Sequence, residues 1–459
     1  MNSKKVTALT LGMALVLLSL VLLSAVSAQA VNIKFGGQMR PRYNFVDHKN
    51  TTGFNSTFSP EHVWSTRIRL GVKVKLDDKN SGFFQVQGIG IWGLKDNRSS
   101  IGPSDTIFDA GFHQAYFTVN QFYDLPLDFQ IGRQEVVLDG HRLIGNVGWF
   151  QGGRSHDSVR LTYSVEDFTF LYVFSQSQEF DNSGSFAGIA IGSSTVDPSD
   201  KLDTVTHIIW GNAKDLLGEH SSTSIYAIYV NASDVNPDLV GPPPVIVDKV
   251  HNDIYTTGLR QEGRLFGLDY RGEFYYQFGQ AEQTELLDDL GTPVARGMDR
   301  EAYMYGLRLG KRFNKVPWKP SLTLWYDFLS GTDWNDITNN KFSTFATLFA
   351  TQHKFYGSMD LYQVSGVLGD GRTTNQLGLR DLAVKTSVQP MDKFLIQADF
   401  HQFWTDTDLS DPDNAPLAAA MGWCTCDTNL GQELDITLVH RYNNYLTISA
   451  GYSRYFATL

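Results

Sequence analysis

The chain has 459 residues, a net charge of −11, 41 glycines and an aromatic content of 13%. The excess of acidic over basic residues excludes the strongly basic character of a nucleic-acid-binding protein. Its two cysteines, Cys424 and Cys426, are separated by one residue. This spacing strains a disulfide and provides only two metal ligands. We therefore expect neither a disulfide framework nor a cofactor.

The first 30 residues have the pattern of a secretory signal peptide. Two lysines precede an apolar run over residues 6–26, and Ala-Gln-Ala at 28–30 provides small residues for cleavage. An uncleaved membrane helix is the alternative, because the run is long enough to span a bilayer. The small-residue site favours cleavage. Residues 31–459 would then carry 36 basic and 49 acidic residues, a net charge of −13.

Apolar and polar residues alternate most clearly from Arg67 to Leu76. One face of this predicted strand carries aliphatic residues, and the other carries four cations: Arg67, Arg69, Lys73 and Lys75. In a membrane barrel, apolar side chains face lipid and polar side chains face the lumen with a period of two. We therefore expect these four cations to line a pore.

The stretch Leu127–Tyr163 predicts two strands joined by a connection rich in glycine and arginine. It contains four candidate pore-lining residues: Arg133, Arg142, Arg154 and Arg160. Guanidinium groups form paired hydrogen bonds with carboxylates, so this group favours a constriction for an anionic solute. The alternative is structural, in which these arginines pair with Glu135, Asp139 or Asp157 and brace the barrel interior.

Strand-like alternation continues to the end of the sequence. It recurs in Leu265–Gly279, Ser321–Phe328, Phe394–Trp404, Glu433–Arg441 and Leu446–Phe456. Aromatic residues near the expected strand ends predict girdles at the membrane interfaces. These residues are Trp92, Tyr116, Tyr163, Trp210, Trp318 and Trp404.

Short polar links alternate with long connections between the predicted strands. The long ones cover Asp47–His62, Leu94–Ala110, Ser175–Asp203, Asn231–Asn252, Gln280–Arg300, Gly331–His353 and Thr405–Leu430. Short turns on one rim and long extracellular loops on the other are typical of outer-membrane barrels. Because no change in composition divides the chain, we predict one all-β domain over residues 31–459. Its expected form is a transmembrane antiparallel β-barrel of about 18 strands with a water-filled lumen.

Four separated segments carry a resemblance to the alginate export family of outer-membrane barrels. They are GRQE with RLIG (132–135 and 142–145), GRSHDSVRL (153–161), FATLFATQHKFYGSMDLY (345–362) and the region from Gly431 to the last strand. The resemblance implies a monomeric, 18-stranded barrel in the outer membrane of a Gram-negative-type bacterium. It also implies an arginine-lined constriction that passes a polyuronate outward, and it places Arg154 and Arg160 in the family motif.

Three further groups of residues have both a functional and an ordinary interpretation. Ser155-His156-Asp157 contains the residue types of a hydrolytic triad, but neighbours on a strand point to opposite faces, which favours chance adjacency. Calcium is a weak possibility at an acidic loop with the oxygen ligands Asp406, Asp408, Asp411 and Asp413, where a solvated loop is favoured. The aromatic segment 342–356, with His353 and Lys354, either stacks on sugar or packs against the wall.

These observations predict an outer-membrane channel for passive diffusion of anionic solutes, without an enzymatic cycle. Its expected partners are outer-membrane lipid, an anionic polysaccharide or small anionic solute, and a periplasmic export partner. A general porin for small solutes is the first alternative, and a non-conducting scaffold or adhesin is the second. An outer-membrane lipase or acyltransferase is the third.

Overall fold

The computed structural model describes residues 31–47, 61–93, 109–178, 185–186, 189–190, 204–232, 252–287, 293–362, 374, 376–417 and 427–457. The expected signal peptide, both cysteines and parts of several long connections lie outside these residues. The described helices are short: η2 (Phe122–Asp124), α2 (Trp334–Thr338), η4 (Gln352–Lys354) and η5 (Pro412–Asn414). No helix in the described part of the chain is both long enough and apolar enough to cross a membrane.

Strands form nearly all of the remaining regular structure. They are β1 (Asn32–Val46), β2 (Glu61–Lys75), β3 (Asn80–Ile91), β4 (Asp109–Val119), β5 (Leu127–Gln134), β6 (His156–Val165), β7 (Phe168–Gln178), β8 (Ser185–Phe186), β9 (Ile189–Ala190), β10 (Thr204–Lys214), β11 (Ser222–Ala232), β12 (Asn252–Leu265), β13 (Leu268–Leu287), β14 (Pro293–Arg312), β15 (Ser321–Leu329), β16 (Lys341–Phe342), β17 (Leu379–Met391), β18 (Phe394–Trp404), β19 (Asn429–Arg441) and β20 (Thr447–Ala457).

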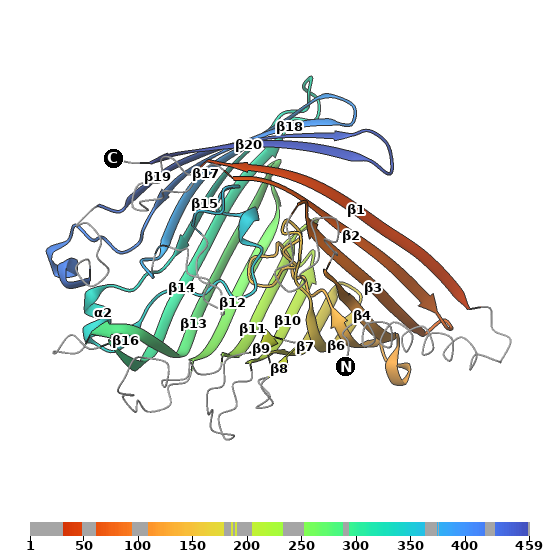
Figure 1. Cartoon of the computed structure of the whole chain (residues 1–459), viewed down its shortest axis with the longest axis horizontal. Helices are drawn as coiled ribbons and strands as arrows, with labels where there is room; N and C mark the ends of the chain where they lie inside the picture. The colour runs from red at the N-terminus through yellow and green to blue at the C-terminus, as the bar shows by residue number, and fades with distance from the viewer. Residues whose placement is uncertain are drawn as a thin grey trace.

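One sheet contains 18 of these strands within the described residues, which confirms the predicted fold class and strand number. Each long strand pairs antiparallel with the next long strand, and the two-residue β16 adds a parallel pairing to β14. The strands β1 and β20 are the edges of this sheet, and among the described residues no pairing joins them. Figure 1 shows the long strands tilted side by side in a strongly curved wall.

The links between strands differ in length at the two rims. The short ones include residues 76–79, 166–167, 266–267 and 392–393, and this end is called the short-turn rim below. The opposite end is called the long-loop rim. The predicted division into a rim of short turns and a rim of long loops is confirmed, with one exception.

The exception is the predicted long loop Gln280–Arg300. Here β13 and β14 continue as a hairpin to Leu287 and from Pro293, so the prediction was wrong. Ala281 and Met298 are each only 1% exposed, because they pack on an apolar cluster formed by later connections. That support comes from residues distant in the sequence, which local alternation does not reveal.

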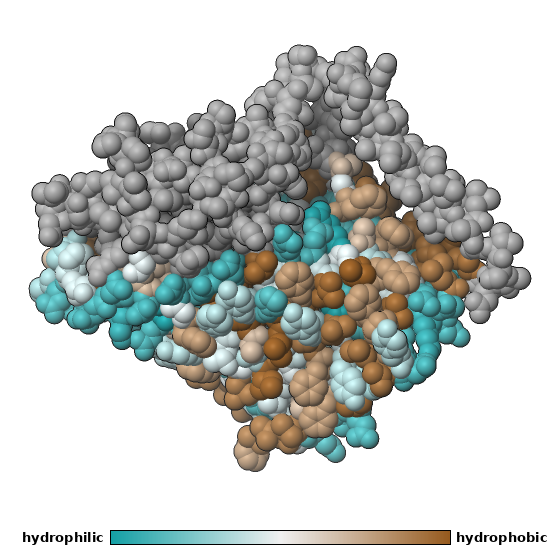
Figure 2. All heavy atoms as spheres, turned by 90° about the horizontal axis from the view of Figure 1, so that it is seen from below, coloured by the Kyte–Doolittle hydropathy of each residue, from teal (hydrophilic) through white to brown (hydrophobic). Residues whose placement is uncertain are grey.

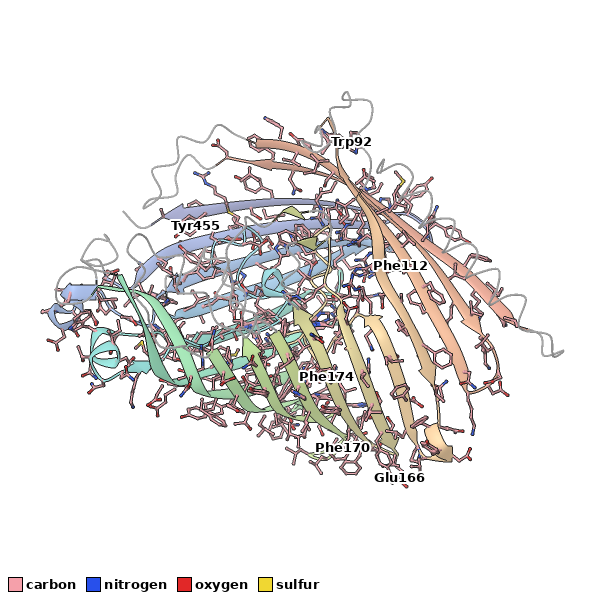
Figure 3. The ribbon with its side chains drawn as sticks, turned by 60° about the horizontal axis from the view of Figure 1, so that its bottom comes forward. Trp92, Phe112, Glu166, Phe170, Phe174 and Tyr455 are labelled. Atoms are coloured by element: carbon pink, nitrogen blue, oxygen red, sulfur yellow. The ribbon has the colours of Figure 1, made fainter. Side chains whose placement is uncertain are left out.

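The outer face of the wall is apolar. On β7, Phe170 is half exposed and Leu171 is buried, and Phe170 and Phe174 lie on the same face of the strand. Figure 3 shows both phenylalanines along β7, beyond the turn that carries Glu166. Figure 2 shows apolar side chains spread over the middle of the visible face, with hydrophilic ones gathered toward its left and right margins. This arrangement suits contact with lipid.

Two connections fold back into the space that the sheet surrounds. We call residues 135–155, between β5 and β6, inner loop 1, and residues 330–362, after β15, inner loop 2. A hydrogen bond of 2.9 Å from the Gly145 amide to the Phe349 carbonyl joins them, as does one of 3.0 Å from Thr351 to His141. In Figure 1 inner loop 1 and the later part of inner loop 2 lie within the curve of the sheet, whereas α2 and β16, in the first part of inner loop 2, lie at the left end of the strands.

The contact between the inner loops and the wall is apolar. Leu143 and Ile144 of inner loop 1 belong to one buried cluster with Phe345 and Phe355 of inner loop 2. Inward-facing wall residues such as Val173 complete this cluster. The predicted pattern of polar residues on every inward face therefore fails on β7 and its neighbours, because these strands cover an internal core rather than water.

Candidate functional site: the interior of the barrel

Two arginines of β1 hold the tip of inner loop 1 through its backbone carbonyl groups. Arg40 donates to the carbonyls of Gly148 at 2.7 Å and Phe150 at 2.8 Å. Arg42 donates to the carbonyl of Trp149 at 2.7 Å, and its guanidinium lies 4.0 Å from the centre of the Trp149 ring. Carbonyl groups bind these cations without cancelling their charge.

Two arginines of β2 continue this contact, as the alternation on that strand predicts. Arg67 is only 3% exposed and donates to the Gln151 carbonyl at 3.3 Å. Arg69 donates to the side chain of Gln87 at 2.7 Å and lies 3.4 Å from the carboxylate of Glu135. The structure thus places both arginines in the interior, and Glu135 is the acidic group that reaches them.

Glu135 begins inner loop 1 and joins it to the wall. His113 of β4 lies 2.8 Å from one carboxylate oxygen, and the Asn146 amide donates to the other at 3.0 Å. Burial by itself would raise the pKa of the Glu135 carboxyl. The hydrogen bonds with His113 and Asn146, together with the charge of Arg69, outweigh burial and lower this pKa below its usual range.

Arg142 lies at the centre of the interior and is neutralised there. Its guanidinium donates to Asp327 of β15 at 2.8 and 2.9 Å and to Glu273 of β13 at 3.0 Å. The Tyr356 hydroxyl accepts a further hydrogen bond at 3.0 Å, and the Phe355 ring centre lies 3.8 Å away. Arg142 lies in the interior and braces it, as in the structural alternative, but its partners are Asp327 and Glu273 and not the acidic residues that were predicted.

A network of alternating charges surrounds this centre. Arg260 lies 3.6 Å from Asp139 and 2.5 Å from Glu262, and Arg271 also pairs with Glu262 at 2.9 Å. Arg308 lies 3.7 Å from Glu273. Each cation of this network has an acidic partner, so the network braces the wall against the inner loops.

Arg154 ends inner loop 1 and keeps its charge. Its guanidinium donates to the Ala350 carbonyl at 3.3 Å and lies 5.7 Å from the centre of the Phe349 ring. Within the described residues no carboxylate lies at ion-pair distance from it. Arg154 lines a cavity of about 380 Å³ on the long-loop side of inner loop 1, together with His113, Arg133 and Ser155.

Arg160 lies on the inner face of β6, on the other side of inner loop 1. Its Nε donates to the Thr162 hydroxyl at 3.2 Å. Among the described side chains, no carboxylate forms an ion pair with Arg160 either. The residue lines a second cavity of about 310 Å³.

Three of the predicted pore-lining cations lie elsewhere. Arg133 shares a face of β5 with the exposed Ile131, and it pairs with Asp157 at 2.6 Å, with about half of each side chain exposed. Lys73 and Lys75 are exposed near the short-turn rim, and Lys75 pairs with Asp78 in the following turn at 2.7 Å. Lys73 and Lys75 share a face of β2 with Arg69 but lie toward its short-turn end, away from the interior cluster. Arg133 lines the cavity beside Arg154, but its charge is paired with Asp157.

The structure shows how the acidic residues of the predicted calcium loop are used. No group of three or more candidate metal ligands occurs in the described part of the chain. Asp406 accepts from the Gly331 amide at 3.0 Å, and Asp411 accepts from the Asp413 amide at 3.0 Å. Asp408 likewise accepts from a neighbouring backbone amide. The carboxylates are used to stabilise turns, and the segment is packed rather than fully solvated, since Leu409 and Leu417 are buried in an apolar cluster.

The remaining predicted groups follow the ordinary interpretation. Asp157 is exposed beside Arg133, and His156 is buried against the Phe349 ring on the opposite face, so no triad forms. The aromatic segment 342–356 packs into the internal core. His353 stacks on Trp149 with ring centres 4.0 Å apart.

Sequence reasoning missed several interior residues. Arg40 and Arg42 alternate with apolar residues on β1, and this signal was available without the structure. Arg260 and Arg308 also face the interior. Trp210 was expected in an interfacial girdle, but its indole N–H donates to Asp139 of inner loop 1 at 3.0 Å.

Comparisons with known proteins agree with this architecture. The sequence profile of a family described as "Alginate export" matches residues 31–457. The crystal structure of Pseudomonas aeruginosa OccK8 (OprE) is similar with a TM-score of 0.54 and 12% identity, over 93% of this chain and 94% of that chain. The crystal structure of Pseudomonas aeruginosa OccD3 (OpdP) gives a TM-score of 0.49 and 11% identity, over 94% of this chain and 87% of that chain. A search of curated proteins found no match.

Proposed function

We propose that the interior of this chain, which belongs to the alginate export family, passes an anionic solute. The proposed cargo is a polyuronate such as alginate. The match to the alginate export family supports an outer-membrane channel without an enzymatic cycle. Passage is by diffusion, since the proposal requires no energy-coupled step.

The observation that carries this proposal is the pair Arg154 and Arg160. Arg154 belongs to inner loop 1 and Arg160 to β6, and the two residues line different cavities. Within the described residues neither has a carboxylate at ion-pair distance. Cations without acidic partners attract carboxylates, and fixed guanidinium groups offset the cost of removing water from them. The buried arginines that do have acidic partners supply rigidity instead.

Measurement of reversal potentials in planar bilayers tests this proposal. The purified protein should prefer anions, and replacing both Arg154 and Arg160 by glutamate should abolish or reverse this preference. Arg264→Glu is the matched control, because Arg264 is 60% exposed, pairs with Asp269 at the short-turn rim and lines neither cavity, so it should leave selectivity nearly unchanged. Cation preference in the unmodified protein would contradict the proposal.

The nature of the cargo needs a separate experiment. Oligouronates should block the current at lower concentrations than neutral oligosaccharides of equal length. Equal blockade by both would favour a general porin for small solutes, and absence of any conductance would favour a scaffold or adhesin. The monomeric state and a periplasmic export partner belong to the same proposal, and they are tested by light scattering and by affinity capture of the intact protein.

A further inference from the structure

The cavity beside Arg160 has a defined place in the fold. It has a volume of about 310 Å³ and lies between inner loop 1 and the short-turn rim. Its lining includes Leu138 and Asp139 of inner loop 1, Thr162 of β6, and Trp210 and Asn212 of β10. The volume is at the lower end of the range of small-molecule pockets, roughly 300–1,000 Å³.

The one acidic side chain that lines this cavity is already engaged. Asp139 accepts hydrogen bonds from the Trp210 indole at 3.0 Å and from the Tyr226 hydroxyl, and Arg260 lies 3.6 Å from its other oxygen. Its negative charge is therefore compensated within the protein and does not neutralise Arg160. Asp128 of β5 also attracts Arg160, but the two residues form no ion pair.

The guanidinium of Arg160 is positioned but not saturated. Its Nε donates to the Thr162 hydroxyl at 3.2 Å, which fixes the orientation of the planar group. Its two terminal nitrogens have no hydrogen-bond partner in the described part of the chain. Two parallel N–H donors in this geometry match a carboxylate, with which arginine forms paired hydrogen bonds.

Trp210 supplies a flat apolar surface in the same cavity. The hydrogen bond from its indole to Asp139 holds the ring in place. A large aromatic ring is suited to pack against the apolar C–H face of a sugar ring. Asn212 and Ser222 also line the cavity, and a hydrogen bond of 2.8 Å from the Asn212 amide to the Ser222 hydroxyl oxygen leaves the hydroxyl proton of Ser222 to donate to a ligand's own hydroxyl groups.

We propose that this cavity is a binding subsite for one carboxylated pyranose ring, that is, for a single uronate unit. The carboxylate lies at the terminal nitrogens of Arg160 and the ring packs on Trp210. The inference deepens the proposed function and rests on it, because it names the unit of cargo recognised on the short-turn side of inner loop 1.

Calorimetric titration of the full-length protein in detergent tests the subsite. The probes are glucuronate and glucose, which differ only in a carboxylate in place of a hydroxymethyl group. Glucuronate should bind and glucose should bind at least roughly tenfold more weakly, a difference of about 1.4 kcal/mol. Arg160→Gln and Trp210→Ala should each weaken glucuronate binding by roughly tenfold or more, whereas Trp210→Phe should retain most of it.

Matched controls use the same residue types at exposed positions. Arg264→Gln and Trp318→Ala alter side chains that are about 60% exposed in or near turns, and both should bind glucuronate like the unmodified protein. Should Arg160→Gln fail to fold, Arg160→Lys tests the same point, because it keeps the charge but loses the paired donors.

The outcomes separate this inference from the proposed function. Equal binding of glucose and glucuronate, or full binding by Trp210→Ala, would overturn the subsite. An anion-selective channel that binds no glucuronate would also overturn it while leaving the proposed function standing. Cation selectivity together with glucuronate binding at Arg160 would instead refute export of an anionic polymer.

Discussion

Arg142 and Asp327 are 185 positions apart in the sequence, and the guanidinium of one donates two hydrogen bonds, of 2.9 and 2.8 Å, to the carboxylate of the other. The first residue belongs to inner loop 1 and the second to β15. Both side chains are at most 3% exposed. This contact therefore connects the segment that fills the interior to the opposite part of the wall.

Replacing Arg142 by alanine should loosen inner loop 1 and destabilise the protein. The change leaves the carboxylates of Asp327 and Glu273 buried without this partner, which typically costs about 3–5 kcal/mol. Thermal unfolding in detergent measures the loss, and single-channel recording should show larger or noisier conductance. In a double-mutant cycle, Asp327→Asn combined with Arg142→Ala should cost less than the sum of the two changes.

The control for this experiment is the exposed pair Arg264 and Asp269. These side chains are 60% and 53% exposed, so Arg264→Ala should change stability by less than about 1 kcal/mol. Equal losses for Arg142→Ala and Arg264→Ala would contradict the assigned role of Arg142.

Glu135 should make stability depend on pH in the acid range. Its pKa in the folded protein is lowered, because hydrogen bonds with His113 and Asn146 outweigh the effect of burial. A lowered folded-state pKa contributes stability above the unfolded value, about 4.3, and this contribution disappears as the pH falls through the folded value. Unfolding temperatures measured from pH 7 to pH 3 should fall less in Glu135→Gln than in the unmodified protein.

Glu219→Gln is the control for the pH experiment, since Glu219 is exposed in the turn between β10 and β11. Its acid profile should match that of the unmodified protein. A Glu135→Gln profile that also matches would show that the contacts of Glu135 do not stabilise the ionised carboxylate.

Gly357 of inner loop 2 should not tolerate a side chain. Its φ of +83° is unfavourable for other residues, and an added Cβ would lie 2.6 Å from the carboxylate of Glu433. That carboxylate accepts from the Met359 amide at 2.8 Å, so Gly357→Ala would disturb the attachment of the loop to β19. We expect a loss of about 1–3 kcal/mol in thermal or chemical unfolding.

Gly111 provides the comparison for Gly357. An added Cβ at Gly111 meets nothing within 4 Å, so Gly111→Ala should be nearly neutral. If both substitutions were neutral, the attachment of inner loop 2 through Glu433 would be refuted.

Charge on the outer face should oppose insertion into lipid. Leu70 lies on β2 and is 65% exposed. An arginine at the centre of the lipid-facing surface of a barrel costs about 2–4 kcal/mol. Leu70→Arg should therefore reduce the free energy of folding into lipid vesicles by this amount, whereas Tyr445→Arg, in a turn where the side chain is 99% exposed, should have little effect. No loss for Leu70→Arg would indicate that this face does not meet lipid.

Much of the wall was predictable because its signal is local. The alternation from Arg67 to Leu76 assigned both faces of β2 correctly, with Leu70 outward and Arg69 inward. The same alternation on β1 would have assigned Arg40 and Arg42 to the inward face of the wall. It failed for Trp210, because a girdle residue and an inward residue near a strand end look alike in sequence.

The sequence by itself determined the all-β class, the period of two and the distribution of short and long connections, since each of these depends on neighbouring residues in the chain. Only the tertiary structure decided which arginines keep an uncancelled charge. Arg142 and Arg160 have the same side chain, but Asp327 and Glu273 meet the first and no carboxylate of the described chain meets the second. The pairing of Arg142 depends on contacts with residues 131 and 185 positions away, and composition and periodicity carry no information about those contacts.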